Sequence, residues 1–153
     1  MAVNGRPTLA GMKARDEGTY VLDEQVGFLM RVAAQRHAAL FASRMIEGLT
    51  APQFAILAKL LEIGPCSQNR LGRLVALDAA TIRSVVDRLT GRGFLMIAND
   101  PLDKRHRAVA LSENGHAVAE AAVMVAREIT ESTLAPLTPD ERLQAVALLK
   151  KLG

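Results

Sequence analysis

Apolar side chains recur at three- and four-residue steps along most of this chain, which is the spacing of amphipathic helices. The first stripe predicts a helix from Tyr20 to about Glu47, with Gly48 as its C-terminal signal. Its stripe consists of Val26, Leu29, Met30, Ala33, His37, Leu40, Phe41, Arg44 and Met45. Residues 1–19 show no periodicity and are expected to form a flexible arm.

Three shorter helices are predicted next from their start and stop residues. Thr50 is a predicted N-cap for a helix that ends at Gly64. Ser67 caps a short helix, and Asp78 caps a further helix over about residues 79–92.

The pattern then changes to two short strands, residues 94–98 and 107–111, joined by a charged turn. Ser112 begins a long alanine-rich helix to about residue 134, and Thr138 followed by proline begins the last helix. The predicted order is α-α-α-α-β-β-α-α. The expected fold class is mainly α with one small β-hairpin.

Composition narrows the class of protein. At 153 residues, half of them apolar, the chain can form one compact domain without a disulfide or a metal. Five aromatic residues are few for an all-β protein, and one cysteine fits a reducing cytosol. No stretch is long and apolar enough for an export signal or a membrane span, so a cytoplasmic protein with no membrane partner is expected.

The net charge of +3 is uninformative, but its distribution along the chain is not. Residues 64–107 carry eight basic and four acidic side chains, whereas residues 1–63 are close to neutral and residues 108–153 carry a small negative excess. A concentrated basic segment suits a polyanionic partner, although a solvated surface gives the same pattern.

The basic segment contains a helix, a short break, a second helix and a charged hairpin, which suits recognition of double-stranded DNA. In a helix-turn-helix the second helix enters the major groove, where an arginine such as Arg83 can bind guanine. An ordinary amphipathic surface helix remains the alternative. The candidate DNA contacts are Ser67, Gln68, Arg70, Ala80, Thr81, Arg83, Ser84, Arg88, Lys104 and Arg105.

The hairpin strengthens this interpretation. Beside a recognition helix, it can place Arg105 in the adjacent minor groove. Asp103 would repel phosphate, so it is interpreted as an intramolecular partner that orients an arginine. A hairpin tip whose charges serve only solubility is the alternative.

The run from Ser67 to Leu95 resembles the helix-turn-helix of MarR-type regulators. Asp103-Lys-Arg105 resembles the family's Asp-x-Arg wing, and the run from Leu111 to Gly115 resembles its Leu-Thr-x-x-Gly motif, with Ser112 in place of the usual threonine. The resemblance spans about residues 21–150. The basic residue at Arg83 departs from the commonest pattern.

This resemblance implies a fold that is mainly α with a small β-wing, in which a winged helix-turn-helix is joined to a helical dimerisation region. It also implies a homodimer that binds a pseudo-palindromic DNA operator, usually as a repressor. It assigns residues 20–48 and 112–153 to the dimerisation region and residues 50–111 to the DNA-binding domain. The Arg83 variant, together with the segment that begins at Gly64, is most similar to a subgroup associated with catabolism of aromatic acids such as nicotinate-type compounds.

Many such regulators release DNA when a small aromatic carboxylate or phenol binds. Arg36, His37 and Arg44 on the first long helix are the candidate ligand residues, because a buried imidazole beside guanidinium groups suits an aromatic anion. The alternative is a core histidine bonded to a backbone carbonyl, with Arg36 in a surface ion pair.

Other functions find less support in the sequence. Cys66 precedes a helix and could sense oxidants, but a small buried residue fits equally with the pattern. The histidines and Cys66 lack metal-ligand spacing, no cofactor is expected, and no catalytic motif is present, so the chain is not expected to be an enzyme. A ligand-insensitive architectural DNA binder and a helical protein-interaction module are the remaining alternatives.

Overall fold

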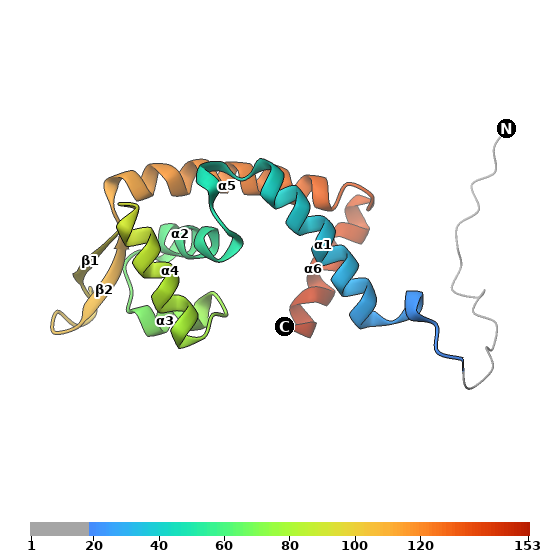
Figure 1. Ribbon diagram of the computed structural model, residues 1–153, viewed down its shortest axis with the longest axis horizontal. Helices are drawn as coiled ribbons and strands as arrows, with labels where there is room; N and C mark the ends of the chain where they lie inside the picture. The colour runs from blue at the N-terminus through green and yellow to red at the C-terminus, as the bar shows by residue number, and fades with distance from the viewer. Residues whose placement is uncertain (1–18) are drawn as a thin grey trace. The chain divides into compact units, whose positions relative to one another are not determined.

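The structure is a computed structural model that describes residues 19–153 (Figure 1). The arm expected over residues 1–19 lies outside the described residues apart from its last position. The described part of the chain divides into two units, of which the first ends at Gln35 and the second covers residues 36–153, so the boundary falls inside α1 (Val26–Arg44). In the first unit, the 3-10 turn η2 (Leu22–Glu24) precedes the first half of α1.

The continuous helix predicted from Tyr20 to Glu47 is wrong at both ends. Extended backbone at Gln25 separates η2 from α1, and the Gln25 side-chain amide donates a 3.1 Å hydrogen bond to the Val21 carbonyl instead of extending the helix. After α1, Met45 is extended and a second 3-10 turn, η3 (Ile46–Gly48), leads into the next helix. No residue of α1 is buried in this single chain, so the apolar stripe of this helix is uncovered.

The second unit follows the predicted order of elements closely, and the fold class is confirmed. Its strands end within one residue of the predicted positions. The elements after η3 are α2 (Ala51–Ile63), α3 (Gln68–Leu74), α4 (Ala79–Gly91), β1 (Leu95–Asn99), β2 (Arg107–Leu111), α5 (Glu113–Thr133) and α6 (Pro139–Leu152).

Side-chain caps start these helices where the sequence predicts them. Thr50 accepts a hydrogen bond from the Gln53 backbone N–H, and the Gln53 side chain accepts one from the Thr50 N–H. Thr138 and Glu141 form the same reciprocal pair at the start of α6. Such caps satisfy N–H groups that have no partner within the helix, so short helices begin at defined residues.

The core of the second unit lies between α2, α3, α4 and the sheet. Its fully buried side chains include Ile56, Leu57, Leu71, Ile82 and Leu89. Burying each such side chain contributes roughly 1.5–3 kcal/mol of transfer free energy. This core fixes the orientation of α4, whose opposite face is left for solvent.

The two strands form an antiparallel hairpin in which Leu95 pairs with Leu111 and Asn99 with Arg107. Cys66, just before α3, adds a bridge to Val109 through two backbone hydrogen bonds of 2.8 and 3.2 Å. The middle of β2 is therefore bonded directly to the segment that enters α3.

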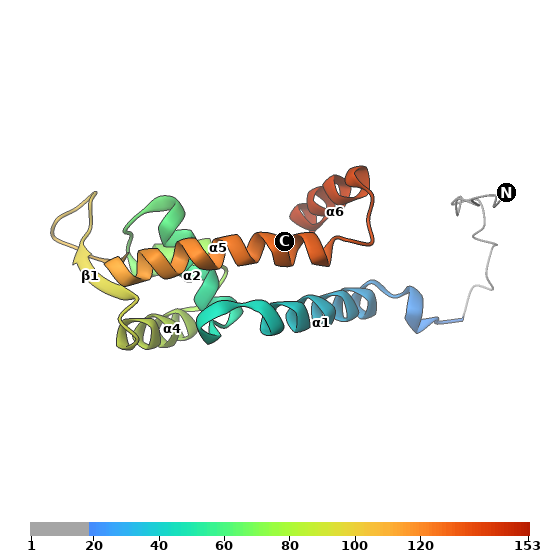
Figure 2. The same cartoon turned by 90° about the horizontal axis from the view of Figure 1, so that it is seen from above.

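Helix α5 packs along α2, as Figure 2 shows from above, and buries Ala119 and Ala122. Its start passes so close to the chain before β1 that a Cβ at Gly115 would lie 1.8 Å from the Phe94 carbonyl oxygen. Helix α6 turns back beside the end of α5, where Arg142 bonds Glu131 at 2.6 Å. Among residues 19–153, no helix has the length and hydrophobicity needed to cross a bilayer.

Candidate nucleic-acid interface

A concave surface between α3 and α4 brings together five of the predicted DNA contacts. It encloses about 770 Å³. The predicted residues that line it are Gln68, Ala80, Arg83, Ser84 and Arg88. Asn69, Ala79 and Asp87 line it as well, and the sequence analysis assigned no site role to Asn69 or Asp87. Asn69 lies one residue after Gln68 near the start of α3, and only the packing of α3 against α4 brings it to this surface.

The fold presents this face of α4 to solvent because the other face is in the core. Ile82, Val86 and Leu89 are buried, whereas Arg83 and Arg88 are exposed. Neither arginine has an acidic partner within 4.0 Å among the described residues. The two guanidinium groups are therefore available to an anionic partner.

Three other predicted contacts have local roles in the helix starts. The Thr81 hydroxyl donates a 2.8 Å hydrogen bond to the Asp78 carboxylate, so its proton is already committed. The Ser67 hydroxyl accepts a 3.3 Å hydrogen bond from the Arg70 backbone N–H. The Arg70 side chain is exposed on α3 but does not line the concave surface.

The Asp78 carboxylate caps the N-terminus of α4. Asp78 accepts hydrogen bonds from both the backbone N–H and the hydroxyl of Thr81, each 2.8 Å long. These bonds favour the ionised carboxylate, so they lower the pKa of Asp78. The carboxylate that caps the first turn of α4 is consequently ionised at neutral pH and can accept both hydrogen bonds.

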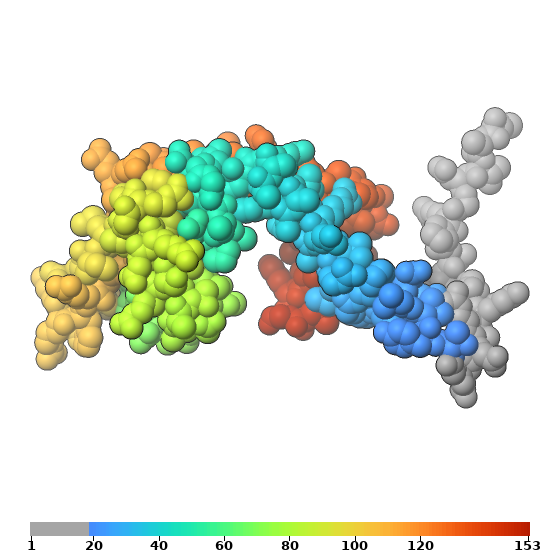
Figure 3. Space-filling view, viewed as in Figure 1, coloured from blue at the N-terminus to red at the C-terminus, as the bar shows by residue number. Residues whose placement is uncertain are grey.

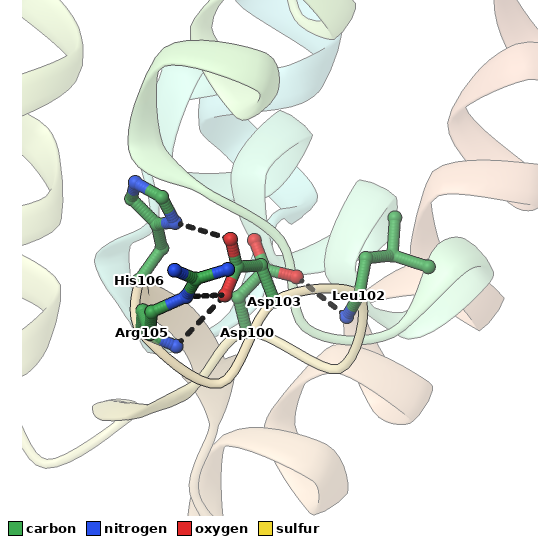
Figure 4. Close-up of polar contacts among 5 residues, drawn as sticks. All are labelled: Asp100, Leu102, Asp103, Arg105 and His106. Carbon is green, nitrogen blue, oxygen red and sulfur yellow. Dashed lines mark hydrogen bonds and ion pairs between the residues drawn. The ribbon is translucent and has the colours of Figure 1, made fainter.

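The wing is organised by two aspartates, drawn in Figure 4. Asp100 accepts a 2.8 Å hydrogen bond from the Leu102 backbone N–H. Asp103 accepts a 3.0 Å bond from the backbone N–H of Arg105 and lies 3.4 Å from its Nε. His106 approaches the second Asp103 oxygen at 3.1 Å. Each carboxylate thus closes a tight turn in the loop.

These contacts hold Asp103 ionised and leave the basic tip in solvent. The backbone hydrogen bond from Arg105, followed by the contact with His106, lowers the pKa of Asp103. The Arg105 side chain stays 91% exposed despite its contact with Asp103, and Lys104 is exposed beside it. Figure 3 shows that the wing and the α3–α4 pair extend on the same side of α5.

The candidate ligand residues on α1 are not buried. His37 is exposed, and its Nδ1 lies 2.9 Å from the Thr133 hydroxyl of α5, so the prediction of a buried imidazole is wrong. Its partner is also not the backbone carbonyl of the alternative interpretation. Arg44 donates a 2.5 Å hydrogen bond to Ser132, and Arg36 has no ion pair among the described residues.

A groove between α2 and α5 lies near these residues, and the sequence analysis missed it. It encloses about 650 Å³. Its lining is apolar with polar groups at one side: Phe54, Ala58, Leu61, Glu62, Val123, Ala126, Arg127, Thr130 and Glu131. Phe41 of α1 contacts Phe54 edge-on, with ring centroids 5.9 Å apart, and His37 lies next to Phe41. Pairing of α2 with α5 creates this groove, and periodicity within one helix carries no information on such pairing.

Cys66 is buried, and burial raises the pKa of its thiol. This favours the interpretation of Cys66 as a packing residue, because a raised pKa lowers the thiolate fraction that oxidants attack. The part of the chain that the structure covers holds no cluster of three metal-ligating side chains.

Known proteins are similar to this chain in both sequence and fold. The MarR family sequence model matches residues 49–106. The HTH-type transcriptional repressor NicR of Pseudomonas putida is 40% identical over 138 residues, which cover 90% of this chain and 87% of NicR.

Two solved structures agree with that relationship. A probable transcriptional regulator from Pseudomonas aeruginosa is 50% identical, with a TM-score of 0.82 over 87% of this chain and all of the other. Bordetella bronchiseptica BpsR, whose DNA binding is regulated by 6-hydroxynicotinic acid, is 42% identical, with a TM-score of 0.81 over 88% of this chain and 97% of BpsR. These relatives are regulators and not enzymes. The chain belongs to the MarR family of winged helix-turn-helix transcriptional regulators.

Proposed function

We propose that this regulator is a homodimeric repressor that binds a pseudo-palindromic operator and releases it when a small aromatic acid binds. The observation that carries the DNA-binding part is the unpaired arginine face of α4, which lies on the same side of the second unit as the basic wing. In this proposal α4 enters the major groove, and Arg105 enters the neighbouring minor groove.

The roles within the interface follow from chemistry and exposure. Arg83 binds guanine O6 and N7, the small Ala80 lets the backbone approach the base edges, and Arg88 binds phosphate. Gln68 and Ser84 add polar contacts, while Ser67 and Thr81 act through the helix caps. Arg70 and Lys104 supply positive charge near the phosphates, and Asp103 orients Arg105.

The dimeric part is supported by uncovered apolar side chains on the terminal helices, in the regions 20–48 and 112–153. On α6, Leu143 is 73% exposed, and Val146 and Leu149 are exposed beside it. In the first unit Val26 and Leu29 are likewise exposed. Contiguous exposed apolar residues of this kind mark protein interfaces, and a second copy of the chain is the partner proposed here.

The DNA-binding proposal is tested by titrating the dimer with duplex DNA at several salt concentrations. Release of counterions from phosphates predicts a linear fall of log K with log salt concentration. Arg83→Ala is expected to cost roughly 1–3 kcal/mol on the selected operator and to relax sequence preference. Arg73→Ala, which removes an exposed arginine outside the concave surface, is the control. A flat salt dependence contradicts the proposal.

The effector part is supported by the groove between α2 and α5 and by the nearby basic side chains of α1. An aromatic ring fits among Phe54, Leu61 and Val123, and its carboxylate can reach a guanidinium or the His37 ring. Arg36, His37 and Arg44 are proposed as ligand residues, with Arg127 as an additional one. The similarity to NicR and BpsR favours a nicotinate-type acid and control of aromatic catabolism.

A thermal-shift screen with 6-hydroxynicotinic acid and other aromatic acids tests this part. Linkage requires that an inducer bind the free dimer more tightly than the DNA-bound dimer, typically by about 1–3 kcal/mol. A hit should therefore raise the melting temperature and weaken operator binding. If His37→Ala leaves the response unchanged while Arg127→Gln abolishes it, the effector contacts α5 and not His37.

A further inference from the structure

One arginine outside the proposed DNA-contacting set lies at the end of α4 and contacts two other parts of the second unit. Arg92 immediately follows α4, and its Nη2 donates a 2.6 Å hydrogen bond to the Glu47 backbone carbonyl. The same nitrogen lies 3.7 Å from the Glu47 carboxylate. The guanidinium carbon lies 4.6 Å from the centre of the Phe94 ring, a stacking distance for a cation over an aromatic face.

Arg92 and its two partners belong to three different elements. Arg92 is the C-cap residue of α4, the proposed recognition helix. Glu47 lies in η3, the turn between α1 and α2, and has a positive φ of 56°. Phe94 is buried directly before β1, the first strand of the wing. A single side chain therefore ties the end of α4 and the start of the wing to the turn that follows α1.

We propose that Arg92 is a positioning residue for operator binding: it fixes the orientation of α4 and the wing relative to η3 without touching DNA. This inference rests on the proposed function, because it assumes that α4 and the wing bind the operator. It assigns a role in sequence-specific recognition to a residue outside the DNA-contacting surface.

The geometry distinguishes this role from a simple surface ion pair. The Arg92 side chain is one-third exposed, and its shortest contact is to a backbone carbonyl, which is a charge-assisted hydrogen bond. The contact with the half-exposed Glu47 carboxylate is long, and exposed pairs of this kind contribute little. The planar guanidinium stacks and donates at the same time, which lysine cannot reproduce.

The experiment compares Arg92→Lys, Arg92→Ala and Glu47→Gln with the wild-type dimer. The probes are a duplex of roughly 24 base pairs, selected from a random library by the wild-type protein, and a scrambled duplex of equal length. Affinity for each is measured at several salt concentrations. Glu47→Gln is the matched control, since it changes the distant carboxylate and keeps the backbone carbonyl that accepts the short bond.

Arg92→Lys keeps the positive charge, so it separates positioning from a phosphate contact. We expect both Arg92 variants to bind the selected duplex about tenfold more weakly, with unchanged affinity for the scrambled duplex and an unchanged salt slope. Glu47→Gln should bind like the wild type. Wild-type affinity in Arg92→Lys, or equal weakening on both duplexes with a smaller salt slope, overturns the proposal. If Arg92→Ala does not fold, Arg92→Lys alone decides.

Hydrogen exchange of the free dimer gives a reading that does not depend on DNA. In Arg92→Lys, the amides at the end of α4 should exchange about tenfold faster than in the wild type, while those of α5 keep their rates. Unchanged exchange at the end of α4 overturns the positioning role. If the wild-type protein selects no duplex from the library, the proposed function fails, whereas the exchange result still decides whether Arg92 holds α4.

Discussion

Helices α4 and α6 both carry apolar side chains at helical steps, but these side chains are in opposite environments. On α4, Ile82 and Leu89 are almost completely buried by the rest of the chain. On α6, Leu143 and Leu149 are mostly exposed. An amphipathic pattern therefore shows that a helix has a partner surface, but it does not show whether that surface lies in the same chain.

The largest effect on stability is expected at Gly115, where the start of α5 packs directly against the Phe94 backbone. A Cβ at Gly115 would lie 1.8 Å from the Phe94 carbonyl, so Gly115→Ala must displace backbone and should lower the free energy of unfolding by about 3 kcal/mol or more. Urea denaturation followed by circular dichroism measures this. Gly91→Ala is the control, because its Cβ meets nothing within 4 Å and should be neutral or stabilising by up to about 1 kcal/mol. Equal stability of both variants would show that the packing at Gly115 is loose.

The next effect concerns the uncovered face of α6. Leu149→Asp places a charge where the proposed dimer buries an apolar side chain, so dimer dissociation should become at least about 100-fold easier. Sedimentation velocity at several protein concentrations measures the shift. Gln144→Asp makes the same change of charge on an exposed polar position of the same helix and should leave the dimer intact. A stable dimer in Leu149→Asp would remove this face from the proposed interface.

A smaller effect on stability is expected at the start of α5, the helix between β2 and α6. The Ser112 hydroxyl accepts a 2.9 Å hydrogen bond from the Gly115 backbone N–H and donates a 2.5 Å bond to the Gly93 carbonyl. Ser112→Ala removes both bonds and should cost roughly 1–2 kcal/mol of unfolding free energy. Ser112→Thr keeps the hydroxyl and should be close to wild type in the same thermal or urea unfolding assay. A large loss in Ser112→Thr would point to the added methyl group instead.

The smallest effect on stability is expected in the wing. Asp103→Asn removes an ionised acceptor from an exposed loop, so it should leave the melting temperature unchanged and weaken operator binding only a few-fold. Since the Asp103 pKa is lowered, its hydrogen bonds are fully present above the ordinary carboxyl pKa and are lost as the pH falls through the lowered value.

The Asp103 prediction is checked by following the carboxyl carbon in an NMR pH titration. The midpoint should lie below about 3.9, the value for an unperturbed aspartate. Operator affinity at any pH from 5 to 8 should therefore not depend on titration of Asp103. A midpoint at or above the unperturbed value would contradict the hydrogen-bonded geometry of the wing.

Local chemistry made the winged part predictable from sequence. Caps such as Thr50, Asp78 and Thr138 satisfy the helix start within three residues, so their effect can be read from neighbouring positions. The turns at Asp100 and Asp103 are equally local. Distant segments decide the exposure of His37 and the groove in which Phe54 meets α5. The break at Gln25 is local, because the Gln25 side chain bonds the Val21 carbonyl, and the apolar periodicity does not report that bond. The concave surface was anticipated at Arg83 but not at Asn69, which only the packing of α3 on α4 brings there.

The backbone bridge between Cys66 and Val109 determines how the wing can vary. It anchors the middle of β2 to the segment that enters α3, while the tip around Leu102 and Lys104 has only local bonds. Insertions and substitutions are best tolerated at such exposed, locally bonded tips. Substitutions at the tip should therefore change the contacts that the wing makes without disturbing the core that holds α4.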